Sequence, residues 1–144
     1  MNEMADIEAI KLLKARYFRC LDTQDWAGWR ACMTDDLEAR FDDSVTAPGE
    51  TETSGLSVSG ADELVRLISG NLKGATTVHH GHTPEIALTG RDTATGIWAM
   101  VDMLRIPGAP DMRGYGHYHE HYRRQDGAWR IARLHVTRLR MDRG

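Results

Sequence analysis

The stretch HYHEHYRRQDGAWRIARLHV, residues 117–136, carries the clearest structural signal in the chain. On either side of Gln125-Asp126-Gly127, polar and apolar residues alternate. An Asp-Gly step between two such segments is typical of a tight β-hairpin turn. The stretch therefore predicts two antiparallel strands, at about residues 112–124 and 127–141.

The same two-residue period starts at Thr76 and continues up to this hairpin. Two further extended segments, at about 76–89 and 93–106, are bounded by turn-forming residues at 89–92 and 107–110. Residues 76–141 are therefore predicted to form a four-stranded antiparallel meander.

The N-terminal half has helical periodicity instead. Apolar residues recur every three or four positions at 6–22, around Trp26 and Trp29, and from Ser59 onward, where Ser59 and Asp62 resemble a capping box. Between the helices we expect a short strand at 37–42 and, from Asp43 to Val58, a long loop or a partly mobile lid. Helices at one end of a chain and strands at the other predict an α+β fold.

Composition narrows the class of protein. The 144 residues suit a single domain, 1–144, and the net charge of −3, with no long basic run, argues against a nucleic-acid partner. Two cysteines give no disulfide framework, and no apolar run is long enough for a leader or a membrane span. We expect a cytoplasmic protein without a membrane or nucleic-acid partner.

Three segments resemble a known superfamily. Residues 9–22 resemble the first helix, Thr77-Val78-His79-His80-Gly81-His82 the first long strand, and residues 122–131 the last hairpin of SnoaL-like proteins of the nuclear-transport-factor-2-like superfamily. The resemblance implies a cone-shaped open barrel, in which a curved antiparallel sheet wraps around N-terminal helices and encloses a pocket. This fold hosts both enzymes and binding proteins, so it does not by itself give the function.

Within the superfamily, the pattern is closest to scytalone dehydratase, bile-acid 7α-dehydratase and hexachlorocyclohexane dehydrochlorinase. Their shared Asp-His dyad falls at Asp22 and His79, and the pocket tyrosine of the bile-acid enzyme falls at Tyr17. Two positions depart from the pattern. Leu104 stands near the second catalytic His of scytalone dehydratase, and Leu134 stands where the dehydrochlorinase has an Arg.

These residue types suit proton transfer at carbon. A neutral imidazole can act as a base near neutral pH, and a carboxylate can fix its tautomer. Tyr17 could polarise a substrate oxygen, although five helical steps place it about 140° from Asp22 on an ideal helix. The alternatives are structural: Asp22 as a cap for the following helix, His79 as a half-buried strand residue, and Tyr17 as a core residue.

The strand at 93–106 supplies candidate pocket residues. Trp98, Met100 and Asp102 share one face of it, and the resemblance turns that face, together with Tyr118, toward the cavity. Asp102 could then be a desolvated acid that donates a hydrogen bond to an oxyanion. The alternative is a solvent-facing Asp102 near the strand end.

A row of histidines raises the question of a metal. His117, His119 and His121 share one strand face, as metal-binding histidines can. Because Tyr118 occupies the opposite, cavity-facing side, these histidines are predicted to point outward. We expect neither a metal nor a cofactor.

Together these observations predict a cofactor-independent lyase or isomerase, dehydratase-like, for a small hydrophobic cyclic substrate. His79 would be the base, Asp22 its orienting partner and Tyr17 the polariser. Two alternatives stay open: a non-catalytic small-molecule-binding domain, and the small subunit of a ring-hydroxylating dioxygenase. The apolar outer face of the sheet predicts a homo-oligomer, either a dimer or a trimer.

Overall fold

The computed structural model describes residues 2–45 and 54–144. Three helices and six strands make up this part of the chain. They are α1 (Glu3–Asp22), α2 (Trp26–Ala31), β1 (Met33–Asp42), β2 (Gly55–Ser59), α3 (Ala61–Asn71), β3 (Thr76–Leu88), β4 (Thr93–Arg105), β5 (Met112–Gln125) and β6 (Ala128–Arg143).

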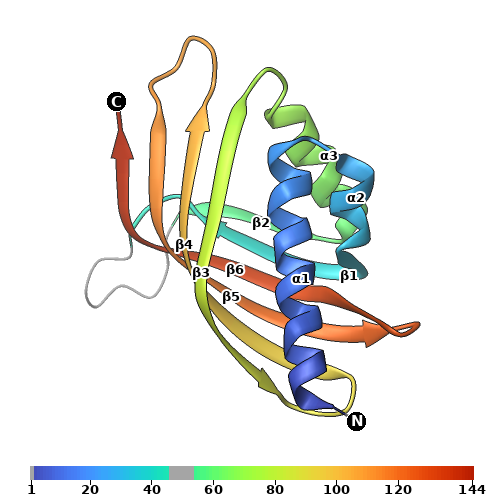
Figure 1. The fold of residues 1–144 in the computed structure, drawn as a ribbon. Coiled ribbons are helices and arrows are strands. Elements are labelled where there is room, and N and C mark those ends of the chain that lie inside the picture. The colour runs from blue at the N-terminus through green and yellow to red at the C-terminus, as the bar shows by residue number, and fades with distance from the viewer. Residues whose placement is uncertain (1, 46–53) are drawn as a thin grey trace.

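The strands form one curved, open sheet in the order β2-β1-β6-β5-β4-β3. Neighbouring strands are antiparallel except β1 and β6, which run parallel. The three helices lie on the concave side, with α2 and α3 beside the C-terminal end of α1 (Figure 1). The predicted α+β cone is confirmed, and its sheet has one parallel pair that the sequence did not indicate.

The predicted meander is present as β3 to β6. Asp126 and Gly127 both have positive φ, of 52° and 78°, as a two-residue hairpin turn requires. The pairing of Gln125 with Ala128 closes the turn directly. Helix α1 begins at the Asn2 cap, whose side chain accepts from the Ala5 N–H, and it buries Ile10, Leu13 and Tyr17 against the sheet.

Lys14 interrupts the apolar stripe of α1 and is nevertheless completely buried. Its Nζ lies 2.8 Å from an oxygen of Glu120 on β5, and it also lies over the rings of Tyr17 and Tyr118. Burial lowers the pKa of Lys14, and the charge of Glu120 opposes that shift. The lysine is therefore part of the contact between helix and sheet, and not a solvent-facing break in the stripe.

Three boundaries differ from the sequence-based expectation. Strand β1 begins at Met33, before the predicted start at residue 37. A register shift between Met33 and Glu38 accompanies the exposed Asp35 and Asp36, which pair with Arg30 and Arg123. The predicted capping box is wrong: Gly60 is the N-cap of α3, and Ser59 donates to Glu38 from strand β2 instead.

The predicted loop 43–58 is wrong at its C-terminal end. Residues 55–58 belong to β2, which pairs with β1 and buries Val58. Residues 46–53, the centre of the expected lid, lie outside the described residues.

Candidate active site

Asp22, the last residue of α1, contacts His79 on β3. One carboxylate oxygen, Oδ1, lies 2.6 Å from Nδ1 of His79, and the other, Oδ2, accepts the His79 backbone N–H at 2.9 Å. Oδ1 also accepts from the Thr77 hydroxyl at 2.9 Å. Because a carboxylate can only accept, Nδ1 donates to Oδ1, and in the neutral imidazole Nε2 is then the acceptor.

Asp22 and Phe18 together hold the His79 ring in this orientation. Phe18, one turn before Asp22 on α1, stacks against the imidazole with ring centroids 6.4 Å apart and planes 14° apart. Phe18 can approach β3 because residue 81 is glycine: a Cβ at Gly81 would lie 2.7 Å from the Phe18 ring. The imidazole is therefore fixed by a carboxylate at one nitrogen and an aromatic ring on one face.

His79 lines a mostly apolar cavity of about 240 Å³ between the sheet, the C-terminal end of α1 and α3. Most of its wall is aliphatic or aromatic, with a few polar groups. The lining residues are Tyr17, Leu21, Trp29, Phe41, Leu56, Ile68, Leu72, Thr77, His79, Asp102, Met103, Leu104, Met112, Tyr118, Val136 and Arg138.

Tyr17 and Tyr118 are both in this wall, with ring centroids 6.1 Å apart. Burial raises the pKa of each phenol well above its ordinary range, so both stay protonated and can donate hydrogen bonds. Helix α1 does not unwind before Asp22, so Tyr17 and Asp22 point in different directions. They approach the site separately: Tyr17 from the cavity wall, and Asp22 through His79.

Two predicted pocket residues are not in the wall. Trp98 and Met100 share the inward face of β4 with Asp102, but they lie farther along the strand, in the core. The Trp98 indole donates to Tyr122 Oη at 2.9 Å, and the Met100 sulfur lies 3.6 Å from Arg138 Nη1. Their assignment to the cavity is wrong because strand alternation gives the face of a residue and not its depth under the helix.

Asp102 does face the cavity, yet it is not a free acid. Arg138 on β6 donates to both of its oxygens, at 2.7 and 3.0 Å, and also to the backbone carbonyl of Asp42. This pair spans β5 at Gly114, where a Cβ would lie 2.3 Å from Asp102 Oδ1. The expected role of Asp102 as a hydrogen-bond donor is therefore not supported, because its oxygens are occupied as acceptors.

Comparison with known proteins now places the chain in a family. The model of the SnoaL-like domain matches residues 2–135, nearly the whole chain. The protein belongs to the SnoaL-like domain family.

Three relatives illustrate the range of this family's neighbours. "Probable cyclase FGR4" of Gibberella zeae is 26% identical over 136 residues, which cover 90% of this chain and 89% of that protein. Rv3472 of Mycobacterium tuberculosis, a protein of unknown function, is 27% identical with a TM-score of 0.78, covering 96% of this chain and 74% of that one. The dehydrochlorinase LinA-type3 of Novosphingobium barchaimii, at 17% identity and a TM-score of 0.77, covers 98% and 91% and shares the fold.

Two side chains in the wall of the cavity at His79 were not predicted from the sequence. The resemblance does not indicate Arg138, because it places the pocket arginine of the dehydrochlorinase at Leu134, four residues earlier on the same strand. Trp29 was assigned only to a helix face, although it is 1% exposed and lines the cavity. The sequence signal for a place of Trp29 in the cavity wall is its position on the short helix that follows the turn after Asp22.

The row formed by His117, His119 and His121 lies on the outer face of the sheet, as predicted. His119 and His121 are exposed, and His119 Nε2 lies 3.1 Å from the Thr137 hydroxyl. Among residues 2–45 and 54–144, no three His, Cys, Asp or Glu side chains form a metal-binding group. In that same part of the chain, no helix is both long and apolar enough to span a membrane.

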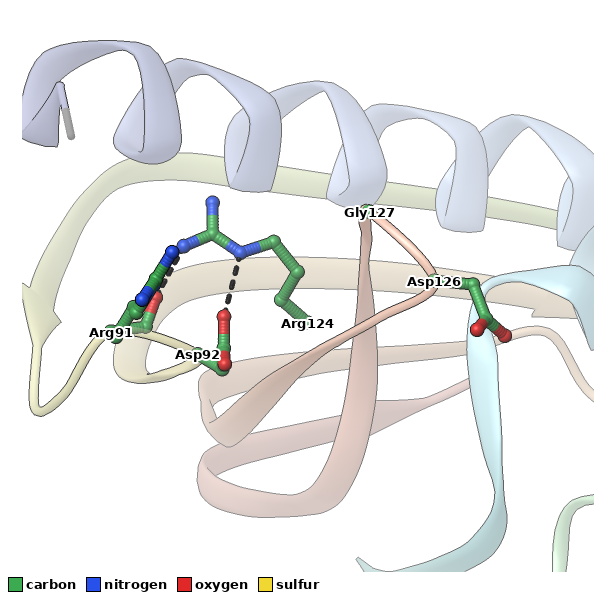
Figure 2. Close-up of a pocket in the computed structure, with 5 residues that line it drawn as sticks. All are labelled: Arg91, Asp92, Arg124, Asp126 and Gly127. Atoms are coloured by element: carbon green, nitrogen blue, oxygen red, sulfur yellow. Dashed lines mark hydrogen bonds and ion pairs between the residues drawn. The ribbon is translucent and has the colours of Figure 1, made fainter.

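A second cavity, of about 710 Å³, lies between the β3–β4 and β5–β6 turns. Figure 2 shows the Arg124 side chain reaching toward Arg91 and Asp92, whereas Asp126 lies apart from them. Arg124 donates to Asp92 at 3.0 Å, to Asp6 at 2.7 Å and to the Arg91 carbonyl. The described residues that line this second cavity include no His or Cys, so the cavity at His79 is the stronger candidate for chemistry.

Proposed function

We propose that this protein is a cofactor-independent lyase or isomerase, dehydratase-like, that acts on a small hydrophobic cyclic molecule. The observation that carries the proposal is the 2.6 Å contact between Asp22 and Nδ1 of His79. In the neutral imidazole this contact keeps the proton on Nδ1, so that Nε2 can accept one, and His79 lines an apolar cavity. The relative named as a probable cyclase and the structural neighbour named as a dehydrochlorinase support a reaction of this class.

The proposed chemistry begins at a ring carbon. Nε2 of His79 takes a proton from carbon, and the C–H electron pair forms a carbon–carbon double bond as a neighbouring hydroxide leaves. The imidazolium then gives that proton to the departing hydroxide, so that water is released. In an isomerisation, the imidazolium would return the proton to a different carbon.

Three side chains support this reaction. Asp22 stabilises the imidazolium while it exists and keeps the ring in one tautomer. Tyr17 donates a hydrogen bond to the carbonyl oxygen of the substrate, whose negative charge increases during proton removal. The apolar wall excludes water, which strengthens both interactions.

The cavity size restricts the substrate. An engineered apolar cavity of about 150 Å³ holds benzene, whereas drug-sized ligands occupy roughly 300–1,000 Å³. The volume of about 240 Å³ lies between them and fits a molecule with one or two rings.

A panel of one- and two-ring hydroxyketones, followed by the absorbance of the conjugated product, tests this function. We expect water loss with at least one compound and a fall in kcat of about 10²–10⁴-fold in His79→Ala. The control is His80→Ala, which removes the adjacent, outward-facing imidazole and should leave kcat unchanged.

Two outcomes would count against the enzyme. Turnover that survives His79→Ala would contradict the assigned base. Tight binding of the panel without any conversion would favour the non-catalytic binding domain.

A further inference from the structure

A groove of about 570 Å³ adjoins the cavity at His79. Five residues belong to the walls of both spaces, namely Phe41, Leu56, Leu104, Met112 and Arg138. The groove continues along Ile106 and Met141, which do not line the cavity. The two spaces are therefore contiguous, and a ligand in the cavity can extend into the groove.

The junction between the two spaces is built from two cross-strand pairs. Phe41 pairs with Leu56 between β1 and β2. Leu104 pairs with Met112 between β4 and β5. Arg138 comes from β6, which lies between these two pairs of strands in the sheet. Because the register of the sheet fixes all five residues, the junction is a preformed feature of the fold.

The apolar side chains of the groove are not fully covered by the rest of the described chain. Those that remain partly exposed are Leu56, Leu104, Ile106, Met112 and Met141. Single exposed apolar residues are common on a protein surface, whereas a contiguous apolar patch marks a binding site. The second description applies here, because all five line one groove that is contiguous with an apolar cavity.

The charged side chains of the groove do not call for a charged ligand. Arg138 donates to both oxygens of Asp102, and the Asp42 carboxylate, which is buried, lies in an ion pair. Asp43 and Arg143 are exposed and carry opposite charges, so together they give the groove no net sign. The chemistry of its wall therefore favours an apolar group.

We infer that this groove is a second binding site for the substrate: it takes an apolar substituent of the ring that lies beside His79. The substrate class is thereby narrowed to a cyclic molecule with an oxygen at one end and an alkyl chain or a further ring at the opposite end. An apolar cavity of about 150 Å³ holds benzene, so the cavity of about 240 Å³ has room for a ring but not for a long substituent as well. The inference rests on the proposed function only in placing the ring beside His79.

The test uses the 4-alkylphenols from 4-ethylphenol to 4-hexylphenol, whose chain points away from the hydroxyl group. Isothermal titration calorimetry measures the affinity of each compound for the unmodified protein. Full burial of one methylene group raises affinity about 4-fold, and the side chains of the groove remain partly exposed. We therefore expect a gain of about 2- to 4-fold for every added methylene group, up to 4-hexylphenol.

Met141→Trp fills the groove at a residue that does not line the cavity. It should remove most of the affinity gained between 4-ethylphenol and 4-hexylphenol and leave the binding of 4-ethylphenol unchanged. Leu139→Trp is the matched control on the same strand, because Leu139 is 69% exposed and lines neither space, and it should leave the whole series unchanged. A Met141→Trp variant that binds 4-hexylphenol more slowly but equally tightly would assign the groove to ligand entry and overturn the inference.

Two methionines report where the ligand lies in the unmodified protein, so a second measurement does not depend on the folding of any variant. Met103 lines the cavity and Met141 lines the groove. With ¹³C-methyl-labelled methionine, 4-ethylphenol should shift the NMR signal of Met103 but not that of Met141. With 4-hexylphenol, both signals should shift.

The outcomes separate this inference from the proposed function. A flat affinity series, failure to bind any alkylphenol, or a Met141 signal that does not respond to 4-hexylphenol would overturn the inference. A flat series together with turnover of a hydroxyketone would do so and leave the proposed enzyme standing. Chain-dependent binding with the expected shifts, but without turnover of any hydroxyketone, would contradict the proposed enzyme and leave the second binding site standing.

Discussion

Asp22→Asn is the most informative substitution in the site because it changes one atom and removes one charge. In the structure, Oδ2 accepts the backbone N–H of His79 at 2.9 Å, and Oδ1 accepts from Nδ1 and from the Thr77 hydroxyl. An asparagine has only one acceptor oxygen, so it cannot satisfy both sides in the same way.

The backbone decides which way the new amide points. The His79 N–H can only donate, so the amide oxygen must take the Oδ2 position and the NH₂ group must face Nδ1. Nδ1 then has to accept, which moves the ring proton to Nε2. The Thr77 hydroxyl can rotate to suit either arrangement, so it does not oppose the change.

The expected effects follow from this tautomer change. With Nε2 protonated, the base is lost, and kcat should fall by about 10²–10⁴-fold. Stability should fall by only about 1.5 kcal/mol, the low end for a lost hydrogen bond to a charged group, because the Asp22 side chain is 22% exposed. The variant should therefore be folded and inactive.

The assay is ¹⁵N-edited NMR of the His79 ring, read together with kcat on the hydroxyketone identified by the panel. The control is Asp25→Asn, the same substitution three residues away, where the side chain caps α2 by accepting from the Gly28 N–H at 3.0 Å. Asparagine caps as well as aspartate, so tautomer and rate should be unchanged. A His79 ring that keeps its proton on Nδ1 in Asp22→Asn, or a variant with full turnover, would refute the reasoning.

Two further predictions concern stability. Lys14→Met should reduce the free energy of unfolding by about 3–5 kcal/mol, because Glu120 then stays buried without its cationic partner. Adding Glu120→Gln to this variant should restore much of the lost free energy, as measured by urea titration. A Lys14→Met variant that is as stable as the unmodified protein would contradict this. Partial desolvation of its ring against the outer face of the sheet, with His135 and His117 nearby, lowers the pKa of His119. The imidazole is therefore protonated more readily in the unfolded chain, and stability should fall as pH drops below about 6.5. His119→Gln should reduce the difference in unfolding free energy between pH 8 and pH 5, and an unchanged difference would argue against the assignment.

Local signals predicted the parts of the fold that depend on local chemistry. The Asp126-Gly127 turn needs two positive φ angles, and an Asp-Gly step in the sequence is typical of such a turn. Strand β2 could not be predicted in the same way, because Gly55–Ser59 is short and owes its conformation to pairing with β1. Ser59 looked like a helix cap, but Glu38 on the neighbouring strand accepts its hydroxyl proton instead.

The candidate site divides along similar lines. Resemblance brought Asp22 and His79 together although 57 positions separate them, and the structure places them in contact. The pairing of Asp102 with Arg138 was not predicted, because it depends on Gly114 leaving room across an intervening strand. Sequence periodicity assigns faces, whereas such pairs depend on how far along each strand the residues lie.

The end of α1 links these observations, because three of its residues meet the site in three different ways. Phe18 and Asp22, four residues apart, share one face of the helix, whereas Tyr17 points about 100° away from Phe18. The structure uses this divergence: Tyr17 lines the cavity, Phe18 stacks on the His79 ring, and Asp22 holds Nδ1. Since one helix carries all three, the close approach that Gly81 permits between α1 and β3 positions the Asp22 carboxylate, the Phe18 ring and the Tyr17 hydroxyl together.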